Sequence, residues 1–161
     1  MSYETFLESK ALTVDSRGVE VPVTDIHEYL FPFQRQLVTW ALRKGRSALF
    51  ADTGLGKTLM QLEWARRLDV PTLIVAPLAV AQQTVAEGVL LGLDVQYVRR
   101  PTEIAQQVVI TNYELISHFD MAQFGAVVLD ESSILKSVDG KTRTRLIEMG
   151  REVPYLSLIH I

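Results

Sequence analysis

Residues 48–59 read ALFADTGLGKTL: a short apolar run, a glycine-containing turn and the start of a helix-like pattern. A turn of this kind aims backbone N–H groups at phosphate oxygens. Gly54 and Gly56 permit positive φ values and a close approach that a Cβ would prevent. Lys57 supplies a positive charge for the terminal phosphates, and the Thr58 hydroxyl can ligate Mg²⁺. We therefore expect a phosphate-binding loop formed by Thr53, Gly54, Leu55, Gly56, Lys57 and Thr58.

The usual pattern for such a loop, G-x-x-x-x-G-K-[ST], begins with glycine, whereas this chain has Ala51 there. The alternative is a chance glycine-rich turn between a strand and a helix. The flanks favour phosphate binding, because a strand-like apolar segment precedes the turn and helical periodicity follows it.

Composition limits the classes of protein to be considered. The chain has 161 residues and 48% hydrophobic content, which suits one compact domain with a substantial core. A net charge of −3 makes any nucleic-acid contact a local feature. The absence of cysteine excludes disulfides, thiolate zinc sites and cysteine nucleophiles. No apolar run has the length of a membrane span and no signal-peptide pattern is present, so we expect a soluble, cytoplasmic protein.

Short apolar runs alternate with helical patterns, which predicts an α/β fold whose mostly parallel sheet has helices on both faces. The predicted strands are 47–51, 72–76, 95–98, 108–111 and 126–129. The predicted helices are 33–44, 57–68, 80–90, 113–119 and 142–149, with Gly45 and Gly150 as the stops of the first and last. Phe33, Leu37, Trp40 and Ala41 share one face of the first. Residues 1–29 are interpreted as an N-terminal extension with a helix-like stretch near 3–12.

A second element carries acidic residues. The apolar strand at 126–129 ends in Asp130 and Glu131, and ligands of parallel sheets bind at the carboxyl ends of strands. Asp130 is the candidate Mg²⁺ residue, usually acting through water, and Glu131 is the candidate base that activates the attacking water. The alternative is a solvated acidic turn.

Together these motifs resemble the first RecA-like domain of superfamily-two helicases of the DEAD/DEAH type, and most closely Swi/Snf-type translocases and their bacteriophage relatives. The resemblance covers roughly residues 30–155. Residues 51–58 are close to the A-x-x-G-x-G-K-T of that family, and residues 76–80 and 110–114 resemble its motifs that contact the nucleic-acid backbone. Residues 130–133 stand where the family usually has Asp-Glu-Ala-His, with Ser133 in place of the histidine.

Residues 31–36 resemble the aromatic-plus-glutamine motif of the family, in which the glutamine reads adenine, so the resemblance assigns this role to Gln34. A carboxamide offers both a donor and an acceptor for such reading. The alternative is an exposed polar position on a helix whose aromatic neighbours belong to the core.

The resemblance implies a RecA-like P-loop domain that uses ATP and Mg²⁺ and acts as a nucleic-acid-dependent ATPase, either a helicase or a translocase. It assigns catalysis to Lys57, Asp130 and Glu131, and metal binding to Thr58 and Asp130. It also implies double-stranded DNA as the partner and a bacteriophage origin. Basic candidates for phosphate contacts, with surface charge as the alternative, are Arg99, Arg100, Lys136, Lys141, Arg143 and Arg145. Two other hypotheses about the function stay open: a different P-loop enzyme, such as a small kinase, and a nucleotide-binding scaffold without turnover.

The last six residues of the chain match the translation of a DNA adapter. Residues 156–161 read LSLIHI, which is the translation of CTG-TCT-CTT-ATA-CAC-ATC, a transposon-end adapter of sequencing libraries. We expect a read-through artefact here, so that the natural gene continues after Tyr155 into a second RecA-like domain. Without that domain the chain should bind ATP weakly and hydrolyse it poorly. The alternative is a genuine apolar strand.

Overall fold

The computed structural model describes residues 16–52, 54–130 and 140–160. These residues form a six-stranded sheet in which all neighbouring strands are parallel, in the order β1-β6-β5-β2-β4-β3. The strands are β1 Arg46–Phe50, β2 Thr72–Ala76, β3 Val95–Tyr97, β4 Val108–Asn112, β5 Ala126–Leu129 and β6 Tyr155–His160. The α-helices are α2 Pro32–Lys44, α3 Lys57–Leu68, α4 Leu78–Leu90 and α5 Gly140–Glu152. Short 3₁₀ helices are η1 Val23–Asp25, η2 Pro101–Glu103, η3 Tyr113–His118 and η4 Met121–Gln123.

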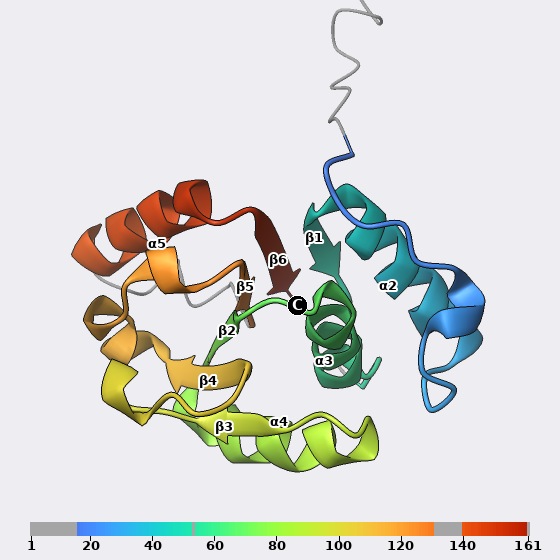
Figure 1. Ribbon diagram of the computed structural model, residues 1–161, viewed down its shortest axis with the longest axis horizontal. Helices are drawn as coiled ribbons and strands as arrows, with labels where there is room; N and C mark the ends of the chain where they lie inside the picture. Colours follow the sequence, from blue (N-terminus) through green and yellow to red (C-terminus); the bar gives the residue numbers. More distant parts are fainter. Residues whose placement is uncertain (1–15, 53, 131–139, 161) are drawn as a thin grey trace, which may run out of the picture.

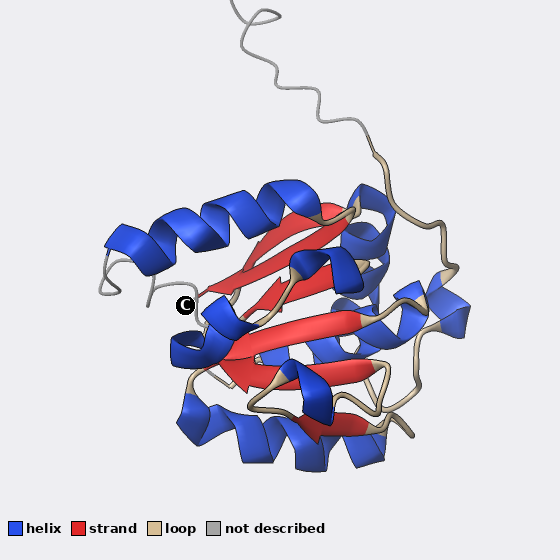
Figure 2. Ribbon diagram, turned by 60° about the vertical axis from the view of Figure 1, so that its left-hand side comes forward, coloured by secondary structure: helices blue, strands red, loops and turns tan. Residues whose placement is uncertain are grey.

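Helices cover both faces of the sheet, as the sequence predicted (Figures 1 and 2). The helices α2, α3 and α4 pack on one face, and α5 with η3 and η4 packs on the other. Strand β2 is buried along its whole length, and its side chains alternate between the two cores: Ile74 faces the first and Val75 the second. Burial on both faces explains why residues 73–76 of this central strand are all apolar.

Most element bounds agree with the sequence predictions to within two residues, and α3, β2 and β5 begin and end at the predicted residues. Two predictions were wrong in detail. Residues 113–118 form a 3₁₀ helix, which suits a short connector. Gly150 does not end α5, which continues to Glu152. A Cβ at Gly150 would lie 3.4 Å from the Leu156 side chain, which is ordinary contact, so this glycine neither ends the helix nor is required by a close approach.

The buried face of α2 also differs from the expected apolar face. The buried residues are Gln34, Val38, Ala41 and Leu42, whereas Phe33 and Trp40 are 44% and 37% exposed. Glycine at the helix end is as predicted, since Gly45 has φ of 70° and donates to Ala41 and Leu42 carbonyls. The helix is therefore rotated so that a polar side chain faces inward and aromatic ones face outward.

Strand β6 lies between β1 and β5 and pairs in parallel with both. Among the described residues, β1 has no other strand partner than β6. The Arg46 side chain strengthens this junction by donating to the carbonyls of Val153 and Gly150. Residues 155–160 thus form a paired strand, as the alternative of a genuine apolar strand expects. The origin of their codons stays a prediction, and resequencing the locus tests it.

The predicted helix-like stretch near 3–12, residue 53 and residues 131–139 lie outside the described residues. No helix in the described part of the chain combines the length and the apolar character that crossing a membrane requires.

Candidate active site

The predicted phosphate loop follows β1 at the carboxyl edge of the sheet and leads directly into α3. Gly54 and Gly56 have φ values of 79° and 69°, the left-handed region in which glycine is favoured. A Cβ at Gly54 would meet no heavy atom within 4 Å, whereas a Cβ at Gly56 would lie 2.4 Å from Gln34 Nε2. The loop is therefore open at Gly54 and in tight contact with α2 at Gly56.

Lys57 is the first residue of α3, and its ammonium group turns back over the loop. Its Nζ donates to the carbonyl oxygens of Ala51 at 3.1 Å and Asp52 at 3.0 Å. Thr58 follows, half-buried, in the first turn of the helix, where backbone N–H groups point out of the helix start. Thr53, the other predicted loop residue, lies outside the described residues.

Asp130 follows β5 at the same edge of the sheet and is 7% exposed. Its backbone N–H donates to the Val75 carbonyl at 2.9 Å, and the Tyr113 hydroxyl donates to its carbonyl at 2.6 Å. Its side chain reaches α3, because Gln61 Nε2 donates to Asp130 Oδ2 at 3.4 Å. The fold therefore brings the predicted metal carboxylate against the helix that begins with Lys57. Glu131, the predicted base, lies outside the described residues.

Gln61 was missed by the sequence reasoning, although it is only 1% exposed and contacts Asp130. A signal was present, since Gln61 lies four residues after Lys57 and therefore on the same side of the helix. It also interrupts the apolar residues Met60 and Leu62 with a polar group.

Gln34 joins α2 to the phosphate loop. Its Oε1 accepts from the Phe31 backbone N–H at 2.8 Å, and its Nε2 donates to the Leu55 carbonyl at 2.8 Å. The side chain is 3% exposed, while neighbouring Phe31 is 65% exposed. The alternative of an exposed glutamine among buried aromatics is therefore wrong, because the helix turns the carboxamide inward to the loop carbonyl.

A cavity of about 600 Å³ opens beside the loop. Three aromatic residues on its wall lie in or just before the first turn of α2, and the Phe31 and Phe33 rings are nearly parallel with centroids 6.3 Å apart. Such walls suit a flat ring system, and a glycine-containing loop at the start of a helix suits the phosphates attached to it. The cavity is lined by Tyr29, Phe31, Phe33, Gln34, Gly54, Leu55, Gly56 and Leu59.

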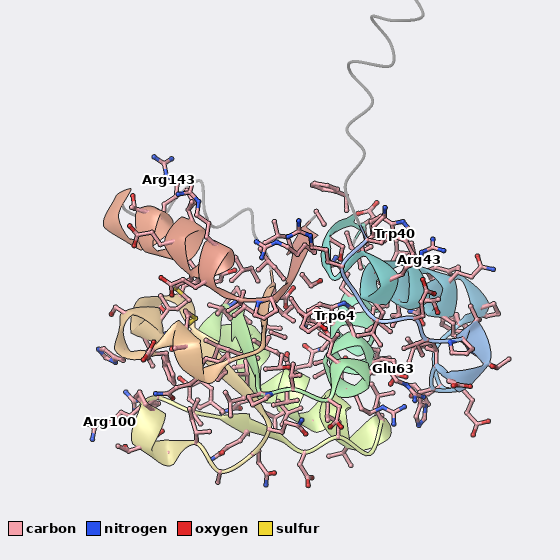
Figure 3. All side chains as sticks on the ribbon, turned by 45° about the horizontal axis from the view of Figure 1, so that its top comes forward. Trp40, Arg43, Glu63, Trp64, Arg100 and Arg143 are labelled. Atoms are coloured by element: carbon pink, nitrogen blue, oxygen red, sulfur yellow. The ribbon has the colours of Figure 1, made fainter. Side chains whose placement is uncertain are left out.

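A buried carboxylate holds the segment that carries these aromatics. Glu63, on α3, accepts from the backbone N–H of His27 at 2.9 Å and forms ion pairs with Arg66 and Arg67 (Figure 3 labels Glu63 and its neighbour Trp64). Burial alone would raise the pKa of Glu63, but hydrogen bonds from Arg66, Arg67 and the His27 N–H outweigh it and hold the pKa below its ordinary value. From the other side, Arg35 donates to the carbonyls of Leu30 and Glu28.

The basic residues predicted to contact nucleic-acid phosphates are not gathered in one place. Some follow β3 at the carboxyl edge of the sheet, and another lies on α5. Arg99 and Arg100 follow β3 and line, with Leu115 and His118, a cavity of about 460 Å³. The backbone N–H of Arg99 donates to Glu103, which fixes the turn that carries both arginines. Arg143 is exposed and projects outward from α5 (Figure 3). Lys136 and the side chains of Lys141 and Arg145 lie outside the described set.

Known proteins resemble this chain in fold but not detectably in sequence. No protein-family model matches the chain, and no curated protein sequence matches it. Among solved structures, the UvsW helicase from bacteriophage T4 superposes with a TM-score of 0.67 at 19% identity, covering 99% of this chain and 60% of that one. The SWI2/SNF2 ATPase core of Sulfolobus solfataricus, solved in complex with double-stranded DNA, gives 0.69 at 19% identity, covering 88% and 34%.

A hypothetical ATP-dependent RNA helicase from Sulfolobus tokodaii gives a TM-score of 0.58 at 15% identity, covering 98% of this chain and 49% of that one. The chain thus spans at most about 60% of the length of these structures. At such identities the likeness concerns the fold. The chain has the α/β fold of the RecA-like domain of superfamily-two helicases.

Proposed function

We propose that this chain is the first motor domain of a nucleic-acid-dependent ATPase, a helicase or a translocase on double-stranded DNA. The observation that carries the proposal is the pair of contacts that Gln34 and Gln61 make: one ties the aromatic cavity to the phosphate loop, the other ties Asp130 to the helix that the loop begins. A base pocket, a phosphate loop and a metal carboxylate are thereby joined at one edge of the sheet.

The residues present fit ATP and Mg²⁺. The loop is open at Gly54, where an added Cβ would meet nothing within 4 Å, and the buried Gln61 Oε1 has no partner among the described residues. No three His, Asp or Glu side chains of the described part gather into a metal group. That agrees with Mg²⁺, which is held by one or two protein groups together with phosphates and water.

The proposed roles follow from position. The aromatic cavity takes the adenine, Lys57 and the backbone of residues 54–58 bind the phosphates, and Thr58 with Asp130 holds Mg²⁺. Mg²⁺ neutralises charge on the phosphate oxygens when bound. Gln34 keeps one N–H for the adenine edge, because its oxygen and its other N–H are engaged with Phe31 and Leu55. Glu131 removes the proton of the attacking water.

Nucleic acid is proposed to lie along the same edge. Arg99 and Arg100 and the loop after β4 follow strand ends, and cationic or amide groups in such positions bind phosphates without reading bases. Support for duplex DNA comes from the SWI2/SNF2 neighbour, which was solved with it. Full activity is proposed to need a second RecA-like domain that supplies arginine fingers.

The test is ATP hydrolysis by the gene product extended through its second domain, with and without double-stranded DNA, beside its Glu131→Gln variant. DNA-stimulated hydrolysis that the variant lacks supports the proposal. Hydrolysis that is indifferent to nucleic acid favours another P-loop enzyme. Nucleotide binding without turnover in the extended protein favours a scaffold.

A further inference from the structure

Gln61 has one buried polar atom without a hydrogen-bond partner among the described residues. The residue is 1% exposed, its Nε2 donates to Asp130 at 3.4 Å, and its Oε1 accepts no hydrogen bond within the described part of the chain. Buried polar atoms of native proteins nearly always have a partner, either in the protein or in ordered solvent or ligand. An acceptor buried at this position therefore points to a donor that the described residues do not supply.

The place of this acceptor limits what the donor can be. Gln61 lies three residues after Thr58, which is nearly one helical turn, so both side chains leave the same side of α3. It contacts Asp130 directly. Its carboxamide is thus beside the two residues that are proposed to hold Mg²⁺.

The orientation of the carboxamide follows from chemistry. An ionised carboxylate only accepts, so the amide nitrogen must face Asp130 and the amide oxygen must face away from it. Water bound to a divalent cation is polarised and acts as a donor, so the groups around a hydrated cation must be acceptors. Mg²⁺ in particular retains several of its waters when a protein binds it.

We propose that Gln61 is a positioning residue for a hydrated divalent cation: its N–H group orients the Asp130 carboxylate, and its carboxamide oxygen accepts from a cation-bound water. The inference rests on the proposed function and deepens it. Groups that act through a metal ligand in this way typically change metal affinity by about ten- to a hundredfold when they are removed.

The experiment compares the full 161-residue chain with its Gln61→Met variant, which keeps the side-chain length and removes both the donor and the acceptor. Gln82→Met, at an exposed position of α4, is the matched control. Mn²⁺ affinity is measured by electron paramagnetic resonance in the presence of ADP, ADP affinity is measured in EDTA, and thermal unfolding is followed in EDTA. Gln61→Leu repeats the measurements if the methionine variant does not fold.

We expect Gln61→Met to weaken Mn²⁺ binding about tenfold or more, with ADP affinity in EDTA unchanged. The unfolding temperature in EDTA should change little, because loss of the long 3.4 Å donor to Asp130 is offset by removal of an unpaired buried acceptor. Unchanged Mn²⁺ affinity would overturn the inference. So would a lower unfolding temperature accompanied by a parallel loss of ADP affinity, which indicates a structural role. If the unmodified chain binds neither ADP nor Mn²⁺, the proposed function fails as well.

Discussion

Two buried polar residues in the middle of α3, Gln61 and Glu63, differ in how completely they are paired. The Glu63 carboxylate has four hydrogen bonds, from Arg66, Arg67 and the backbone of His27, at distances of 2.7 to 3.1 Å. Gln61 makes one long contact with Asp130 and leaves its oxygen unpaired among the described residues. Both residues are essentially inaccessible to solvent.

Under the proposed role of Gln61, this difference separates a structural network from a contact that a ligand completes. A fully paired network in a low-dielectric interior fixes a single geometry, here that of the segment bearing Tyr29 and Phe31. A partly paired group costs stability in the free protein and becomes satisfied only when something binds. One helix therefore carries two kinds of polar contact. The paired network of Glu63 with Arg66, Arg67 and the His27 N–H, here called the clamp, fixes the wall of the aromatic cavity. The contact of Gln61 with Asp130 is incomplete and lies beside the proposed metal residues.

Breaking the clamp should have the largest effect on stability. Glu63→Ala leaves two arginines without their anion and the His27 N–H without its acceptor, so we expect a loss of about 2–4 kcal/mol. Urea unfolding followed by circular dichroism measures it. Glu87→Ala, on the surface of α4, should change stability by no more than about 0.5 kcal/mol. Equal effects of the two substitutions would show that the network is not a clamp.

Removing the loop cation should act on binding without acting on the fold. Within the described part of the chain, Lys57→Ala deletes the contacts of Nζ with two loop carbonyls, so its unfolding midpoint should stay close to that of the unmodified chain. The affinity for ATP should fall by about a hundredfold, or about 2.7 kcal/mol, as expected for loss of a charge-assisted phosphate contact. Isothermal titration with ATP gives the affinity, and undiminished ATP binding would contradict the loop assignment.

The two loop glycines offer a sharper comparison. Gly54→Ala and Gly56→Ala both force a Cβ into a positive φ, which costs about 1–2 kcal/mol. Only Gly56→Ala also drives a methyl group to 2.4 Å from Gln34 Nε2. We expect Gly56→Ala to be the more destabilising and to weaken binding of free adenosine, while Gly54→Ala spares adenosine binding. The same loss of adenosine binding in both variants would argue against the link through Gln34.

The smallest expected effect is the pH dependence that Glu63 contributes. Its folded-state pKa is lowered from the ordinary value of 4.5, so its stabilisation is fully present above pH 4.5 and is lost as the pH falls through the lower, folded value. Urea unfolding between pH 7 and pH 3 should therefore show a shallower decline for Glu63→Gln than for the unmodified chain. If the free energy of unfolding declines with the same slope in both proteins, Glu63 does not contribute to acid unfolding.

Sequence patterns predicted the backbone of this molecule better than its polar contacts. The apolar run 72–76 and the turn into Lys57 were enough to place β2 and the start of α3, because strand burial and glycine conformation are local properties. The inward turn of Gln34 and the Gln61–Asp130 contact depend on residues 21 and 69 positions away along the chain. Periodicity does not show which polar residue of an amphipathic helix faces such distant partners, and it also misplaced Trp40 on the apolar face.

The position of β6 bears on how the chain assembles during synthesis. The strand that leads into the phosphate loop emerges early from the ribosome, yet its hydrogen-bonding neighbour consists of residues 155–160. Among the described residues, β1 therefore has no strand neighbour until residues 155–160 have been translated. The strand that leads into the predicted phosphate loop thus joins the sheet only after a segment more distant in the sequence has been made, so ordering of this loop should follow the pairing of β1 with β6.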